Sequence, residues 1–162
     1  MNRLSELDSW YRRTLPTAIA TRMPSFIDKN ELIDLCSWKM KRGTYRARNL
    51  ALVKSNSRDS VKESSRLAFT QIPDLRKPVT TLCGLAGVGP ATASGVLAAF
   101  RPDLFPFFDE DVAKQIPGLG SIAFTPTWYQ NYADALRRRA ASLASPWNAH
   151  SVGQALWAQS IS

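Results

Sequence analysis

Cysteine and histidine are scarce in this 162-residue chain. The two cysteines, Cys36 and Cys83, lie far apart, each within an apolar helical pattern, and His150 is the only histidine. This excludes a disulfide framework and a four-cysteine zinc or iron–sulfur site within the chain, and it argues against a transition-metal site built by side chains. We therefore expect no cofactor, and two buried thiols in a reducing compartment.

Acidic residues and long apolar runs are also few. The 13 Asp and Glu stand against 21 Lys and Arg, so the formal net charge is +8. This excess favours a polyanionic partner, with nucleic acid ahead of an anionic membrane surface. No run approaches the roughly 18 apolar residues of a membrane span. We expect no membrane association and a soluble intracellular protein, either cytoplasmic or nucleoid-associated, or nuclear in a eukaryote.

Apolar residues recur at the helical period, and Pro, Gly, Ser and Asp mark the ends of the periodic segments. With 44% hydrophobic residues, the pattern predicts an all-α fold in a single helical domain over residues 1–162. Two apolar helices are expected on either side of residues 87–89. The other expected helices are 3–14, ended before Pro16; 29–43, capped by Asp28 and ended at Gly43; 60–72, capped by Ser57 or Asp59; 110–116; 126–144; and 149–159.

Two glycines flank one valine in the segment LAGVGPATASGVL, residues 85–97. A tight turn between helices is expected here, with positive φ at Gly87 or Gly89 and with Val88 packed inward. Backbone N–H groups at the start of the second helix then point outward, where they and the helix dipole favour a phosphate without reading a base. The turn is thus suited to holding DNA irrespective of sequence.

This turn resembles the helix-hairpin-helix motif, in which an apolar residue precedes Gly-apolar-Gly and, after two free positions, Thr-Ala. The alternative is an ordinary helical turn with capping glycines. The complete pattern in a chain of this charge favours the DNA-binding interpretation. The residues that match the motif are Leu85, Gly87, Val88, Gly89, Thr92 and Ala93.

The segment RPDLFPFFDEDV, residues 101–112, extends the likeness. The chain resembles the helix-hairpin-helix (HhH-GPD) DNA glycosylase superfamily, in which a Pro-rich loop after the hairpin leads to a catalytic aspartate at the start of a short helix. Asp109 lies 22 positions after Gly87 and matches that aspartate. The resemblance covers about residues 30–120, with the motif at about 80–100 and the loop and aspartate at 101–112. It implies double-stranded DNA as the partner and no small-molecule cofactor, and we expect a monomer.

Three departures refine what the resemblance implies. Members that also cut the strand carry a lysine two residues after the second glycine of the hairpin, whereas this chain has Ala91 there. The resemblance therefore implies a monofunctional enzyme. The chain also lacks the four-cysteine cluster of some members and is short for additional DNA-clamping domains. The family's hairpin holds a monovalent cation through backbone carbonyls, which here would be those of Leu85 and Val88.

A carboxylate suits the chemistry of N-glycosidic cleavage, because positive charge develops on the deoxyribose as the base departs. We expect Asp109 to act as an ionised group, with backbone N–H donors keeping its pKa low. The alternative is that Asp109 only caps the following helix. Asp111 is the reserve catalytic candidate, and Glu110 is a lesser one.

A basic segment, residues 39–66, carries nine Lys and Arg against two acidic residues. Clustering of this kind favours phosphate binding, although basic residues also serve simply to solvate a helix face. Trp38, Lys39 and Tyr45 are candidates for the base pocket or for a wedge that enters the duplex, with a core position as the alternative for Trp38. The expected phosphate contacts are Gly87, Val88, Gly89, Thr92, Lys41, Arg42, Arg46 and Arg48.

These patterns predict an enzyme that flips a modified or damaged base out of duplex DNA and hydrolyses its N-glycosidic bond, leaving an abasic site. Either base excision repair or defence against modified foreign DNA fits this chemistry. The first alternative is a non-catalytic DNA-binding protein that retains the glycosylase scaffold. A second is an RNA-binding or protein-interaction domain whose hairpin is only architectural. The sequence does not identify the base.

Overall fold

The computed structural model describes residues 3–162, which form helices and loops without a β-strand, so the all-α prediction is confirmed. No helix in this range is both long and apolar enough to span a membrane. The helices are α1 (Arg3–Ser9), α2 (Leu15–Ala20), α3 (Lys29–Arg42), α4 (Ala47–Ser55), α5 (Arg58–Thr70), α6 (Lys77–Leu82), α7 (Pro90–Phe100), α8 (Glu110–Ala113), α9 (Pro126–Leu143) and α10 (Ala149–Ser160), with a π-helical turn, η1 (Trp10–Thr14), after α1.

The prediction that helical structure ends before Pro16 is wrong, because it continues without a break from α1 through η1 and α2 to Ala20. The π-helical turn η1 follows α1, and in it the N–H of Leu15 donates to the carbonyl of Trp10. Pro16 therefore falls in the first turn of α2. A proline there breaks no helical hydrogen bond, because first-turn N–H groups have no partner within their own helix.

Helix α3 has the predicted bounds. Asp28 and Glu31 form a reciprocal capping box, with the Glu31 N–H donating to Asp28 Oδ1 at 2.8 Å and the Asp28 N–H donating to Glu31 Oε1 at 2.9 Å. Gly43 follows the last residue of the helix. Helix α4, directly after it, was not predicted from the sequence. It has no side-chain N-cap, whereas the predicted helices before and after it do.

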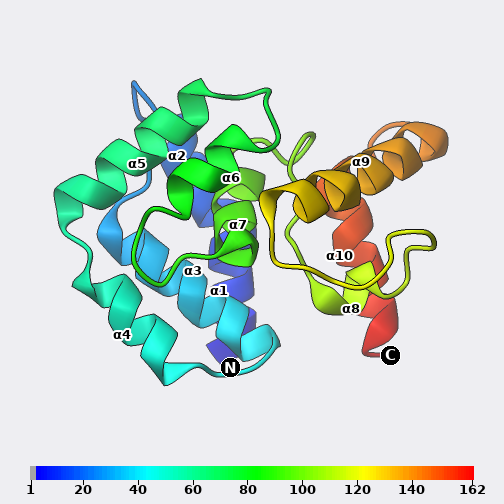
Figure 1. Cartoon of the computed structure of the whole chain (residues 1–162), viewed down its shortest axis with the longest axis horizontal. Helices are drawn as coiled ribbons and strands as arrows, with labels where there is room; N and C mark the ends of the chain where they lie inside the picture. Colours follow the sequence, from blue (N-terminus) through cyan, green and yellow to red (C-terminus); the bar gives the residue numbers. More distant parts are fainter. Residues whose placement is uncertain (1–2) are drawn as a thin grey trace.

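Helix α7 lies near the centre of the molecule, with α4 and α5 to one side and α8–α10 to the other (Figure 1). All residues from Ala91 to Ala99 are buried, and most of them are small. Small side chains allow neighbours to approach closely. A Cβ placed on Gly95 would lie 3.2 Å from a methyl group of Leu35 in α3, and the Tyr11 hydroxyl donates to the Gly95 carbonyl at 2.7 Å.

The remaining helices follow the predicted pattern with one difference. Ser57 caps α5, and α9 and α10 match the expected C-terminal helices. Helix α8 is shorter than the predicted 110–116, because it ends at Ala113. The Pro-rich loop, residues 101–109, joins α7 to α8 and contacts side chains of both α9 and α10. This arrangement positions the candidate site.

Candidate active site

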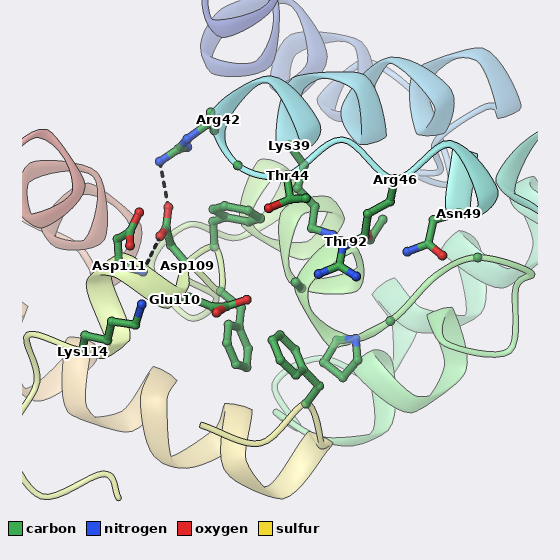
Figure 2. Close-up of a pocket in the computed structure, with 18 residues that line it drawn as sticks. Lys39, Arg42, Thr44, Arg46, Asn49, Thr92, Asp109, Glu110, Asp111 and Lys114 are labelled. Carbon is green, nitrogen blue, oxygen red and sulfur yellow. Dashed lines mark hydrogen bonds and ion pairs between the residues drawn. The ribbon is translucent and has the colours of Figure 1, made fainter. Parts of the chain in front are cut away.

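A cavity of about 440 Å³ brings together three parts of the chain that the sequence analysis singled out. One wall is the end of α3, the loop after it and the start of α4. A second wall is the glycine turn and the start of α7. The third wall is formed by residues 107–111, Lys114 and Phe124. The labelled side chains of these segments converge around a common space (Figure 2).

The glycine turn has the geometry expected of it. Gly87 has a φ of +73°, in the left-handed region, and Val88 is buried. A Cβ on Gly87 would lie 2.7 Å from the Asn49 carbonyl oxygen and 2.9 Å from Val53, so the turn packs directly against α4. Helix α7 then begins at Pro90 after Gly89, with no side-chain cap. Its first N–H groups are thus free of a capping side chain and lie beside the basic start of α4.

The loop that presents Asp109 is fixed by side chains from three helices. The Tyr129 hydroxyl donates to the Pro106 carbonyl at 2.8 Å, and the Tyr132 hydroxyl donates to the Phe107 carbonyl at 2.7 Å. Ser94 Oγ accepts from the Phe108 N–H at 2.8 Å, and His150 Nδ1 accepts from the Phe107 N–H at 3.2 Å. Such a network holds the backbone before Asp109 in one conformation.

His150 is buried and helps to hold the loop before Asp109. Burial, with a smaller contribution from the Arg42 charge, lowers the pKa of His150 to about 3. The imidazole is therefore neutral at physiological pH, and its Nδ1 is available as the acceptor for the Phe107 N–H. It holds the loop without carrying charge into the site.

Asp109 forms a buried ion pair with Arg42. Arg42 Nη2 lies 3.2 Å from Asp109 Oδ2, and their side chains are 5% and 11% exposed. The guanidinium also stacks on aromatic rings, with its Cζ 4.0 Å from the Trp157 ring centroid and 4.6 Å from that of Trp38. Arg42 Nε is buried without a hydrogen-bond partner within residues 3–162. A buried charge with incomplete hydrogen bonding is costly, and the pairing with Asp109 offsets part of that cost.

The expectation of a low pKa for Asp109 is wrong. Burial of the carboxyl is the largest influence and raises its pKa above the usual value. The Arg42 charge and the Asp111 N–H, which donates to Asp109 Oδ1 at 2.9 Å, act in the opposite direction but are outweighed. Asp109 is also the N-cap of α8, so the capping interpretation holds and is compatible with a second role.

Replacing Arg42 by Met tests its effect on Asp109. The Arg42 charge is the strongest influence that lowers the pKa of Asp109, so its removal is expected to raise that pKa further. Any activity that needs the ionised carboxylate will then require a higher pH. Carbon NMR titration of the Asp109 carboxyl measures the shift without an activity assay. Arg101→Met, which alters an exposed pair with Asp103, is the matched control. An unchanged Asp109 titration in Arg42→Met would contradict this account.

The structure separates the three pocket or wedge candidates. Lys39 lines the cavity, and burial lowers its pKa. Trp38 is fully buried, stacked on Tyr11 with ring centroids 3.8 Å apart, so it belongs to the core and not to the pocket. The apolar stripe of α3 continues to Trp38 and explains this position. Tyr45 is 68% exposed in the loop between α3 and α4, outside the cavity lining but beside Thr44 and Arg46, which do line it.

Only some of the residues expected to contact phosphate line the cavity. Gly87, Gly89, Thr92 and Arg46 line the cavity, whereas Lys41 and Arg48 are exposed outside it. Thr92 is buried, so little of its side chain reaches the surface. Arg42 differs from the expectation, because it is buried and paired with Asp109. Helix α3 turns Arg42 inward, towards Trp157 and the loop, in a contact that sequence spacing does not reveal.

The cavity contains further residues, some of which the sequence analysis did not identify. Asp111 and Glu110 line it together with Asp109. Lys114, Asn49 and Phe124 line it as well and were not predicted. Phe124 follows the Gly/Pro-rich turn after α8 and gave no periodic signal in the sequence. Only the packing of this loop onto Phe108 brings it to the cavity.

The residues do not point to a metal centre. Within residues 3–162, no group of three or more His, Cys, Asp or Glu is arranged to hold a metal ion. The Leu85 carbonyl, considered above for a monovalent cation, accepts a hydrogen bond from the Val88 N–H at 3.3 Å. One lone pair of this carbonyl oxygen is therefore already used in a hydrogen bond.

Comparison with known proteins assigns no family to the chain. No protein-family model, curated protein or solved structure matches it. Functional assignment therefore depends on the residues of the cavity and their geometry.

Proposed function

We propose that this protein is a monofunctional DNA N-glycosylase that extrudes a modified or damaged base from duplex DNA and hydrolyses its N-glycosidic bond. The observation that carries the proposal is the cavity in which Asp109, the glycine turn and the cationic residues Lys39 and Arg46 meet. These are the elements that the resemblance to the helix-hairpin-helix glycosylases requires, and they come from segments far apart in the sequence.

In the proposed mechanism, Asp109 stabilises the positive charge that develops on the sugar in the transition state. As the C1′–N bond breaks, the base leaves with the bonding electrons and the sugar becomes positively charged, and the carboxylate stabilises that charge. The carboxylate also orients a water molecule, whose oxygen bonds to C1′ while one of its protons goes to the departing base. Partial burial strengthens this interaction, because the local dielectric constant is low. The fixed loop removes the need to reorganise the carboxylate during the reaction. Since the ionised form is required, base release should increase as pH rises through the raised pKa of Asp109.

Phosphate binding is assigned to the glycine turn and to exposed arginines of the basic segment. Arg46 and Arg48 are exposed and form no ion pair within residues 3–162. Free cations beside a helix N-terminus are suited to a phosphodiester. Lys41 is exposed at the same end of α3 and extends this surface.

Removing these cations one at a time is expected to lower the salt dependence of DNA binding. Each lost phosphate contact should reduce the slope of log affinity against log salt by about 1. We expect this for Arg46→Ala and Arg48→Ala, measured by fluorescence anisotropy with a labelled duplex. Arg137→Ala is the control, because Arg137 is on α9, outside the basic segment, and pairs with Asp134 at 3.7 Å. Equal slopes for wild type, Arg46→Ala and Arg48→Ala would contradict the assignment of this surface to phosphate binding.

The second candidate is a non-catalytic DNA-binding protein. The ion pair with Arg42 favours it, because it occupies one oxygen of the carboxylate. An alkaline-cleavage assay on duplexes with deaminated, alkylated, oxidised or bulky modified bases separates the two. The glycosylase proposal requires strand cleavage only after alkali treatment, with at least one of these bases. Salt-sensitive binding without cleavage on any duplex would support the second candidate, and cleavage without alkali would contradict the monofunctional assignment.

A further inference from the structure

Phe124 is the terminal ring of an aromatic stack that faces the cavity. Its ring centroid lies 5.3 Å from that of Phe108, with an interplanar angle of 16°. Phe108 is in turn nearly parallel to Tyr132, at 5.3 Å and 23°. Phe108 and Tyr132 are buried, whereas Phe124 is 53% exposed and lines the cavity. Within residues 3–162, Phe108 is the only ring stacked on Phe124, so the stack lacks a ring on the side of Phe124 away from Phe108.

The position of Phe124 distinguishes it from other exposed aromatic residues. Tyr45 and Trp147 are also exposed, but neither lines the cavity. Leaving a large apolar ring in water forfeits the free energy of burying it. An exposed ring in a concave site with nearby polar groups is typical of ligand binding.

The polar residues around Phe124 suit the edge of a flat heterocycle. The Glu110 carboxylate points into the cavity and forms no ion pair or hydrogen bond through its side chain within residues 3–162 (Figure 2). Lys39 and Arg46 provide donors on another wall of the same cavity, at the end of α3 and the loop after it. A nucleobase presents both donors and acceptors at its edge and a π-face above and below. A purely apolar ligand would leave these polar groups without partners.

We propose that Phe124 is the stacking residue for an extruded nucleobase, which adds one ring to the series formed by Tyr132, Phe108 and Phe124. The cavity of about 440 Å³ is of the size that small-molecule sites have, and it places this ring and Asp109 on the same wall. The inference rests on the proposed function only in taking the ligand to be a base from DNA. It requires no catalysis.

Photocrosslinking tests the contact directly. The probe is a duplex with one 5-iodouracil placed opposite an abasic site, so that the base is unpaired and easily extruded. On irradiation with wild-type protein, we expect a crosslink that mass spectrometry assigns to Phe124. Phe124→Leu should lose that crosslink and bind this duplex roughly 10-fold more weakly, as expected for one lost base–aromatic stack, while Phe124→Trp retains tight binding. Trp147→Leu, at another exposed aromatic residue, is the matched control.

The outcomes separate this proposal from the proposed function. A crosslink at Phe124 supports the stacking site even if no duplex is cleaved in the alkaline assay. A crosslink assigned elsewhere, or equal affinity of wild type and Phe124→Leu for the unpaired-base duplex, would overturn it even if bases are released. Circular dichroism melts of each variant establish that the fold is retained. Because Phe124 is an exposed loop residue, its replacement is expected to leave the melting temperature nearly unchanged.

Discussion

Asp109→Asn is expected to abolish detectable base release, with a rate lower by at least roughly 100-fold. Duplex binding is expected to stay intact or become stronger. The size of the loss follows from removing a charge that acts on the transition state in a partly buried site. Asn keeps the shape of the side chain and remains a good N-cap for α8, so the local backbone should persist. Binding does not weaken, because the change removes a negative charge close to the DNA phosphates. Single-turnover base release and anisotropy measure the two effects separately.

Asp103→Asn is the control for this substitution. Asp103 lies in the same loop but is exposed and paired with Arg101, outside the cavity. It should leave base release unchanged. Wild-type rates of base release by Asp109→Asn would end the catalytic assignment of Asp109. Loss of release in both variants would instead indicate damage to the loop.

Gly87→Ala is expected to destabilise the protein by about 2–4 kcal/mol, since strain and overpacking both contribute. Gly87 has a φ of +73°, and an added Cβ would lie 2.7 Å from the Asn49 carbonyl oxygen and 2.9 Å from the Val53 amide. Both atoms belong to the backbone of α4, so neither can shift easily to make room for the added Cβ. Denaturant unfolding followed by circular dichroism measures the change in the free energy of unfolding.

Alanine substitutions at two other glycines separate the contributions of backbone strain and overpacking. Gly118 has a φ of +85° with nothing within 4 Å of an added Cβ, so Gly118→Ala measures strain alone, about 1 kcal/mol. Gly89 has an extended backbone and an equally open surrounding, so Gly89→Ala should change stability little. If Gly87→Ala destabilises no more than Gly118→Ala, the close packing of the turn on α4 is not what holds it.

The features predicted correctly from the sequence are those that local chemistry determines. Asp28 and Gly43 bound α3 through a capping box and a following glycine, and Gly87 takes the positive φ that a side chain resists. Asp109 was expected to open a short helix, and it is the N-cap of α8. Each of these depends on residues within a few positions of one another, which a sequence displays directly.

The features that were missed depend on contacts between distant segments. Arg42 lies 67 positions from Asp109, and its place in the ion pair depends on how α3 packs against the loop. Burial of the Asp109 carboxyl raises its pKa, and this burial arises from the packing of segments that are distant in the sequence. Phe124 reaches the cavity only through its stack on Phe108. Helix α4 has no N-cap side chain to mark its start, unlike α3 and α5.

The most direct test of the central claim is to measure the products formed from each modified duplex by mass spectrometry. The account predicts that wild-type protein releases at least one free base together with an equal amount of abasic DNA in an unbroken strand. It also predicts that Asp109→Asn yields neither product from the same duplex. Tight binding of every duplex without any free base would contradict the account and leave a DNA-binding scaffold.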